Sequence, residues 1–129
     1  MELTSRFNIT SWDEKTLRQV TPDRKITLAS VENEIEGDVI GECHQELVMY
    51  YRPDGTASVL GLLHISGSVA GRTGSFAVES LGGYDGTVAT GELRIIPGSG
   101  SGELSQIRGT GATRATREDV TCVLTVDLE

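Results

Sequence analysis

The recurrence of segments rich in β-branched residues and threonine most constrains how this chain can fold. These segments alternate in polarity, lie about 12–16 residues apart and are separated by turn residues, whereas helical periodicity is hard to find. Strands joined in sequence by tight turns form an antiparallel meander, and closure of the sheet removes both of its exposed edges. The sequence therefore predicts an all-β fold, a closed antiparallel up-and-down (meander) barrel of about eight strands, with one domain over residues 1–129.

The alternating segments set the expected strand bounds. The predicted strands are Leu3–Trp12, Ile26–Glu36, Val39–Arg52, Thr56–Val69, Thr73–Leu81, Thr87–Ile96, Glu103–Thr116 and Val120–Leu128. Asp13–Lys25 lies outside them, because Pro22 and mixed charges indicate a loop there, with room for a helical turn at Asp13–Arg18.

Composition and charge exclude several classes of protein. The chain of 129 residues is 37% hydrophobic and 23% charged, which argues against a transmembrane protein and a highly charged disordered chain. A net charge of −8 repels phosphate backbones and anionic lipid, so neither nucleic acid nor a membrane is an expected partner. The N-terminal residues lack a basic leader and an apolar run, which predicts a cytoplasmic protein. We expect Cys43 and Cys122 to be free thiols in that reducing compartment rather than a disulfide.

Turn chemistry predicts which side chains face inward. Pro53 and Gly55 suit a type I turn with a left-handed bulge, which pairs Arg52 with Thr56. The resulting inward set is mostly apolar: Cys43, Gln45, Leu47, Met49 and Tyr51 on one strand, with Ala57, Val59, Gly61, Leu63 and Ile65 on the next.

Two further turns extend this register along the chain. A two-residue turn with Gly71 first and another at Asp85-Gly86 both fit the local sequence. They predict four inward pairs: Val78 opposite Ile65, Ser80 opposite Leu63, Leu93 opposite Val78, and Gly91 opposite Ser80.

Three glycines, Gly61, Gly67 and Gly91, fall in mid-strand on the predicted inner face. They relieve crowding so that a small barrel can close, and if they cluster they leave room for a bound molecule. Both interpretations remain open from the sequence.

The same register gathers ionisable residues on the outer face. It places His44 opposite His64, His64 opposite Glu79, and Glu79 opposite Glu92. His44, His64 and Glu79 are therefore a candidate metal site, while paired charges on a solvated surface are the plainer interpretation.

An apolar group on the outer face predicts a subunit contact. Val48, Leu60, Leu62 and Leu81 lie together on neighbouring strands in this register. Such clusters mark association surfaces more often than scattered apolar residues do, so we expect a homodimer.

No motif for nucleophilic catalysis, phosphate binding, dinucleotide binding or zinc is present, and we expect no cofactor. The predicted interior holds few polar groups, which is how small-molecule pockets are built, although core polar groups satisfied by hydrogen bonds would look the same. A carboxylate from Glu32 or Glu34 is an open possibility. The candidate cavity residues are Cys43, Gln45, Met49, Tyr51, Leu63 and Ser80.

The order and spacing of turn and glycine positions carry a family resemblance from Trp12 to Gly111. They are Trp12-Asp13-Glu14, Met49-x-Tyr51-Arg-Pro-Asp-Gly55-Thr-Ala57, Gly61-Leu62, Gly67, Gly71-Arg72-x-Gly74-Ser75-Phe76, Asp85-Gly86, Ala89-x-Gly91 and Ile96-Pro97-Gly-Ser-Gly100-x-Gly102-Glu-Leu104. This pattern resembles small bacterial proteins grouped as a domain of unknown function, whose fold is similar to the allene oxide cyclase barrel. The resemblance implies a closed barrel with a central cavity and no particular activity.

The chain departs from that family pattern at two positions. The pattern often has Glu where this chain has Leu63, and His where it has Ser80. The predicted register places these two positions opposite each other inside the barrel, where such a pair could act as acid and base. If that pair is the family's working site, the resemblance implies that this member has a changed or lost chemistry.

Three functions follow from this sequence. We expect foremost a barrel that binds a small apolar molecule in its cavity. An enzyme that cyclises or isomerises a small apolar substrate by shape and exclusion of water is the first alternative. A structural or interaction barrel with a packed interior is the second.

Overall fold

The computed structural model describes residues 1–129 and consists of nine strands without helices. No helix long and apolar enough to cross a membrane is present. The strands are β1 (Glu2–Thr21), β2 (Arg24–Gly37), β3 (Val39–Tyr51), β4 (Ala57–Val69), β5 (Arg72–Tyr84), β6 (Ala89–Ile95), β7 (Ser101–Gly102), β8 (Arg108–Ala115) and β9 (Val120–Asp127).

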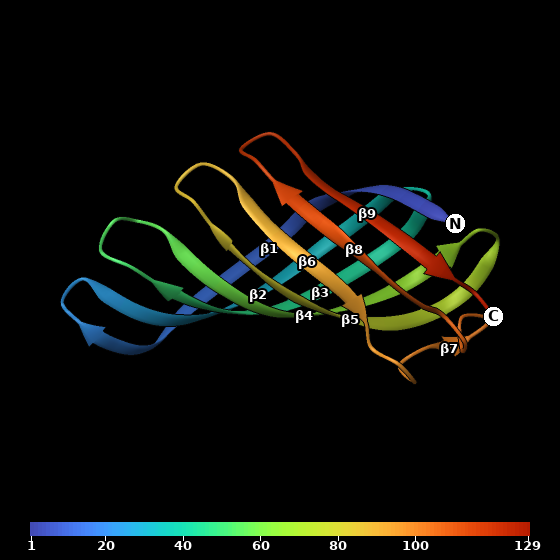
Figure 1. Cartoon of the computed structure of the whole chain (residues 1–129), viewed down its shortest axis with the longest axis horizontal. Coiled ribbons are helices and arrows are strands. Elements are labelled where there is room, and N and C mark those ends of the chain that lie inside the picture. Colours follow the sequence, from blue (N-terminus) through green and yellow to red (C-terminus); the bar gives the residue numbers. More distant parts are fainter.

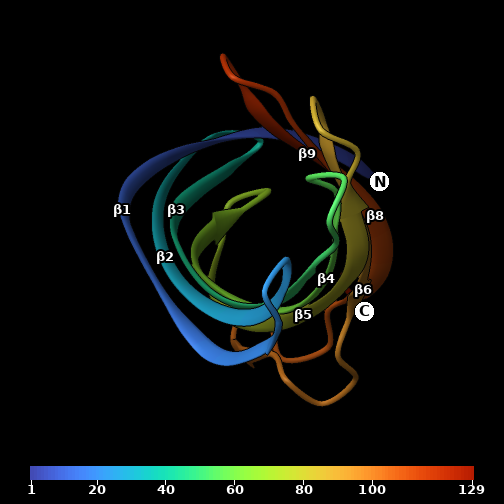
Figure 2. The same cartoon turned by 90° about the vertical axis from the view of Figure 1, so that its left-hand side faces the viewer.

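Eight of these strands close into a barrel, as the alternating segments predict. Each strand pairs antiparallel with its neighbour in the order β4-β3-β2-β1-β9-β8-β6-β5, and β4 pairs with β5 to complete the ring. The pairing of β1 with β9 joins the two ends of the chain. Viewed end-on, the strands surround one interior, and the tip of the β1–β2 hairpin lies in front of its opening (Figure 2).

The predicted loop at Asp13–Lys25 is wrong. β1 continues to Thr21, and β2 begins at Arg24 after a tight turn at Pro22-Asp23. Register shifts interrupt the β1–β2 pairing at Thr10, Leu17 and Val20, so the alternation of polarity changes phase. Much of this hairpin extends beyond the barrel wall and is exposed, which removes the polarity contrast that identifies a strand (Figure 1).

The single strand predicted at Glu103–Thr116 is also wrong. The chain forms the short β7, then turns, and resumes as β8 at Arg108. Leu104 and Ile107 in this turn are buried and belong to the large core cluster. The turn thus places two apolar side chains in the core where the sequence predicted a continuous strand.

The register agrees with the sequence at the first turn and differs at the next two. Arg52 N–H donates to the Thr56 carbonyl at 2.9 Å, and Gln45 lies opposite Leu63, as predicted. The next turn has Ala70 and Gly71 as its central residues, both with positive φ, so Val69 pairs with Arg72. The following connection is a four-residue loop at residues 85–88, with Tyr84 opposite Ala89.

Each of these two turns shifts the register by two residues. The observed pairs are Leu63 with Val78, Ile65 with Phe76, Gly61 with Ser80, Ser80 with Leu93, Val78 with Ile95, and Gly82 with Gly91. A shift of two keeps every side chain on its predicted face, because strand side chains alternate with period two. The predicted opposition of Leu63 and Ser80 is therefore wrong, although both residues face inward.

The buried core fills only one end of the barrel. A cluster of 17 buried residues includes Leu3, Val39, Val69, Ile95 and Leu104, which lie toward the end that carries β7 and both termini. A separate cluster of Ala29, Val31 and Met49 lies toward the opposite end. Val31 and Met49 of this small cluster line a cavity at that end of the barrel, and the candidate site lies there.

Glycines bring four strands close together near the filled end. Gly41 on β3 lies opposite Gly67 on β4, Gly67 opposite Gly74 on β5, and Gly74 opposite Gly102 on β7. A Cβ atom on Gly41 or Gly67 would collide with the backbone of the facing strand. Gly67 therefore serves close approach of strands rather than the cavity.

Candidate functional site: a cavity at the open end of the barrel

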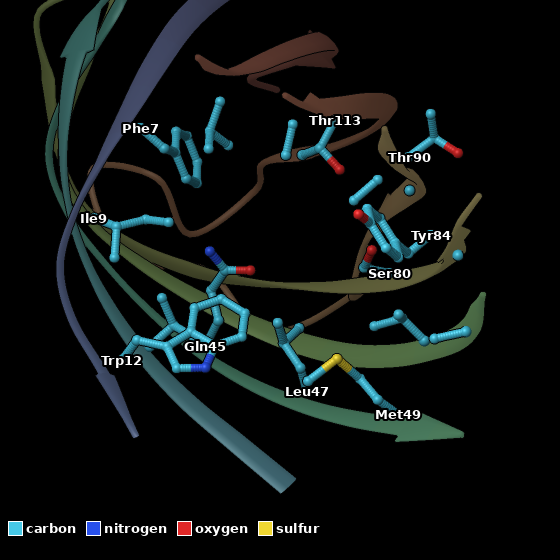
Figure 3. Close-up of a pocket in the computed structure, with 18 of the residues that line it drawn as sticks. Phe7, Ile9, Trp12, Gln45, Leu47, Met49, Ser80, Tyr84, Thr90 and Thr113 are labelled. Atoms are coloured by element: carbon cyan, nitrogen blue, oxygen red, sulfur yellow. The ribbon is translucent and has the colours of Figure 1, made fainter. Parts of the chain in front are cut away.

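A cavity of about 290 Å³ lies inside the barrel at the end formed by the β1–β2, β3–β4, β5–β6 and β8–β9 hairpins. All eight barrel strands contribute to its wall (Figure 3). The lining residues are Phe7, Ile9, Trp12, Val31, Asn33, Gln45, Leu47, Met49, Tyr51, Ala57, Val59, Ser80, Gly83, Tyr84, Ala89, Thr90, Gly91, Thr113, Ala115 and Val120.

Two amides form the polar part of the wall between β2 and β3. Gln45 Nε2 donates to Asn33 Oδ1 at 2.8 Å, and the two residues belong to adjacent strands. Asn33 is 2% exposed, and its Nδ2 has no hydrogen-bond partner. Gln45 extends into the cavity between Phe7 and Trp12 (Figure 3). An unpartnered amide donor therefore lies in a mainly apolar wall.

A carboxylate network holds one side of the rim. Glu14 accepts hydrogen bonds from Tyr51 Oη at 2.7 Å, Thr27 Oγ1 at 2.8 Å and Trp12 Nε1 at 3.1 Å. Burial by itself raises the pKa of Glu14, but these hydrogen bonds and the charge of Lys25 outweigh burial and lower that pKa. The network thus ties Trp12 and Tyr51, two lining residues, to one carboxylate.

Small residues and hydroxyls form the β5–β6–β8 side. A Cβ atom on Gly91 would lie 2.6 Å from Ser80 Oγ and 2.8 Å from Thr113 Oγ1, so glycine at this position leaves the space that the cavity occupies. A Cβ on Gly61 would meet Leu47 Cδ2 at 2.6 Å, so Gly61 makes room for a lining side chain. Two of the three inward glycines thus shape the cavity, whereas Gly67 permits close packing of strands.

The six candidate cavity residues from the sequence divide between the hollow and filled parts of the barrel. Gln45, Met49, Tyr51 and Ser80 line the cavity, whereas Cys43 and Leu63 are buried in the large core cluster. Cys43 and Cys122 are both free thiols, and burial raises the pKa of each to about 12. Neither thiol therefore provides a nucleophile.

Sequence reasoning missed Asn33 and the rim residue Trp12. Asn33 lies midway between Val31 and Ile35 in an alternating strand, so it shares their face of the sheet. This alternation is the signal that could have identified it. Trp12 was not readable in this way, because the bulge at Thr10 reverses the alternation just before it. Tyr84, Thr90 and Thr113 were missed for other reasons. Tyr84 lies beyond the strand predicted at Thr73–Leu81, Thr90 adjoins the inward-facing Gly91, and no turn set the register of the strand that holds Thr113.

The predicted outer-face metal site loses its geometric basis. His44 does lie opposite His64, but His64 lies opposite Ala77. Glu79 instead forms an ion pair with Arg94, with 2.6 Å between Glu79 Oε1 and Arg94 Nε. The structure contains no group of three or more His, Cys, Asp or Glu side chains that could hold a metal ion. The two-residue register shift is the reason that Glu79 lies away from the histidines.

His44 instead has two carboxylate partners. Its Nδ1 contacts Glu32, and its Nε2 lies 2.7 Å from Glu46 Oε1. These hydrogen bonds raise the pKa of His44. Glu32 and Glu34 both face outward, so β2 places no carboxylate inside the barrel.

The lining contains no carboxylate, imidazole, thiol, amine or guanidinium group. Burial, with the hydrogen bond to Glu14 and its charge, raises the pKa of Tyr51 to about 12, so this phenol stays protonated at neutral pH. The arrangement can enclose an apolar molecule and offer it hydrogen bonds, and it lacks a group that exchanges protons readily at neutral pH.

Comparisons with known proteins agree with this description of the fold. The structure of a protein of unknown function from the DUF3224 family of Shewanella oneidensis MR-1 is similar, with a TM-score of 0.80 and 19% identity over 100% of this chain and 97% of that chain. A search of curated proteins found no match. The family model described as "Protein of unknown function (DUF3224)" matches residues 3–126, nearly the whole chain. This chain therefore belongs to the DUF3224 family.

Proposed function

We propose that the protein binds a small, mainly apolar molecule in the cavity at the open end of the barrel. The observation that carries this proposal is the cavity itself, because the barrel is filled at one end and hollow at the other. Thirteen of its 20 lining residues are hydrophobic, so a ligand there would be held chiefly by burial of apolar surface. Ligand pockets commonly measure about 300–1,000 Å³, so a volume of about 290 Å³ favours a small ligand.

Binding fits this wall better than acid–base catalysis does. A cyclase or isomerase acting by shape and exclusion of water remains the alternative, and turnover of a bound compound would distinguish it from a binder. The barrel resemblance to allene oxide cyclase stays a prediction and supports neither function. Two free, buried thiols accord with a reducing compartment, and we propose a cytoplasmic location.

The single tryptophan provides a direct test. Trp12 lines the cavity at its rim, so a neutral naphthylamine dye such as N-phenyl-1-naphthylamine should accept energy from it when bound. We expect saturable energy transfer with one dye per barrel. A Trp12→Phe variant should still increase dye emission on direct excitation while losing the transfer. Absence of any saturable increase, together with no ligand retained in native mass spectrometry of protein from its source, would count against the proposal.

A further inference from the structure

The cavity holds one buried hydrogen-bond donor that the protein itself leaves unused. Asn33 is almost fully buried, lines the cavity, and its Nδ2 has no partner. A buried polar group without a hydrogen-bond partner lowers the stability of the folded protein by about 1–3 kcal/mol. The presence of an unpaired amide in this wall therefore calls for an explanation. A hydrogen bond to a bound molecule would supply the missing partner.

The availability of a donor does not depend on how the two amides are oriented. Each amide has one NH2 and one carbonyl oxygen, and the Asn33–Gln45 hydrogen bond uses one NH2 and one oxygen. Turning both amides over preserves that bond and again leaves one NH2 and one oxygen for other partners. In either orientation, this pair therefore leaves one NH2 group and one carbonyl oxygen without a partner in the protein, and Gln45 extends from it into the cavity (Figure 3).

Charge around the cavity disfavours an anionic ligand. No lysine, arginine or histidine lines the wall to pair with a carboxylate. Glu14 accepts hydrogen bonds from Trp12 and Tyr51 and has a lowered pKa, and the chain as a whole carries −8. A buried charge without a partner is costly, so this wall disfavours an anionic group on the ligand.

We infer that the cavity selects a neutral molecule with an apolar body and a carbonyl oxygen that accepts a hydrogen bond from the Asn33–Gln45 pair. This inference rests on the proposed function and adds the chemical class of its ligand. Fatty-acid and other carboxylate anions fall outside that class.

Three naphthalene probes of similar shape test the inference on the unaltered protein. They are 2-acetylnaphthalene, which has a carbonyl, 2-ethylnaphthalene, which has none, and 2-naphthoate, which is an anion; each competes with N-phenyl-1-naphthylamine. We expect the ketone to bind about tenfold more tightly than the hydrocarbon, as one hydrogen bond to an otherwise unpaired buried donor allows. The anion should bind more weakly than the ketone.

Replacement of the donor tests its role directly. The double variant Asn33→Leu with Gln45→Leu should reduce the ketone's preference over the hydrocarbon to less than about twofold, because it removes both amide donors of the pair. Asn8→Leu is the matched control, since Asn8 is the other asparagine and is exposed on β1. It should leave the preference of the wild-type protein unchanged.

The outcomes separate this inference from the proposed function. Equal affinity for ketone and hydrocarbon, or tightest binding of the anion, would overturn the carbonyl selection while leaving the cavity a binding site. A ketone preference that survives the double variant would overturn the role of the Asn33–Gln45 pair. Failure of all three probes and of the dye to bind would overturn the proposed function as well.

Discussion

Single side chains decide which part of the barrel interior is filled. Leu63 and Ile65 on β4 belong to the large core, whereas Ser80 on β5 and Gly91 on β6 leave space for the cavity. The alternating pattern identifies all four as inward-facing but does not give their depth along the barrel. Whether an inward residue belongs to the core or to the cavity follows from the size of the side chains around it.

Filling the cavity from its small-residue side should prevent uptake. Ser80→Phe places an aromatic ring where Ser80, Gly91 and Thr113 now leave room, so we expect dye affinity to fall at least about tenfold. The measurement is a titration with N-phenyl-1-naphthylamine. Ser66→Phe on the exposed face of β4 is the control and should bind as the wild type does. Unchanged uptake by Ser80→Phe would show that Ser80 is not part of the pocket wall.

The rim network predicts a distinctive tyrosine titration. Burial is the largest cause of the raised pKa of Tyr51, and the hydrogen bond to Glu14 and its charge add to it, giving about 12. The folded protein should show a phenol ionising near pH 12 in an ultraviolet absorbance titration, and this step should move to lower pH in Glu14→Gln.

The same shift gives the sign of a stability change. An unfolded tyrosine ionises near its ordinary 10.0, so stability from the raised pKa is complete below pH 10 and is lost as pH rises toward 12. Denaturant melts across this window should show that loss in the wild type and less of it in Glu14→Gln. If the Tyr51 phenol ionised at the same pH in the wild type and in Glu14→Gln, the role of Glu14 would be contradicted.

At the scale of elements, glycines have different tasks at strand contacts and at turns. Gly41 and Gly67 face each other with no room for a Cβ atom, whereas Gly55 has a φ of +86° and no atom within 4 Å of an added Cβ. The first pair permits contact between strands, and the second position permits a backbone conformation that other residues rarely adopt.

These tasks predict unequal costs of substitution. Gly41→Ala should lower the free energy of unfolding by at least about 2 kcal/mol, because the backbone of β4 must move away. Gly55→Ala should cost about 1 kcal/mol, the usual order for a left-handed residue with a Cβ atom. Urea denaturation measures both. Equal losses at the two positions would indicate that the strand contact is not under steric constraint.

At the scale of the whole molecule, the outer face carries an apolar stripe across neighbouring strands. Val48 lies opposite Leu60, and Leu60 lies opposite Leu81. Leu60, Leu62 and Leu81 are 59%, 55% and 61% exposed, so their outward orientation, as predicted from the sequence, is confirmed.

The homodimer remains a prediction that follows from this stripe. Light scattering at micromolar concentration should give a mass twice the 13.8 kDa of one chain, and Leu62→Lys should reduce it to one chain. Leu17→Lys is the control, since Leu17 is similarly exposed on the β1–β2 hairpin away from the stripe. A wild-type mass of one chain would contradict the dimer.

The amino-acid sequence by itself determined the meander, the closed barrel and the inward or outward face of most strand residues. These properties are local, since alternation has a period of two and the turn at Arg52–Thr56 is set by Pro53 and Gly55. Both later register errors were shifts of two, so the faces remained right while the facing partners were wrong.

Only the tertiary structure decided how the interior is divided and what the cavity contains. The β1–β2 extension, the burial of Leu104 and Ile107 in the core, and the hydrogen bond between Asn33 and Gln45 all depend on pairing and on depth within the closed barrel. Alternation along one strand carries no information about depth. The cavity is therefore decided by the pairing of all eight strands, each of which contributes to its wall.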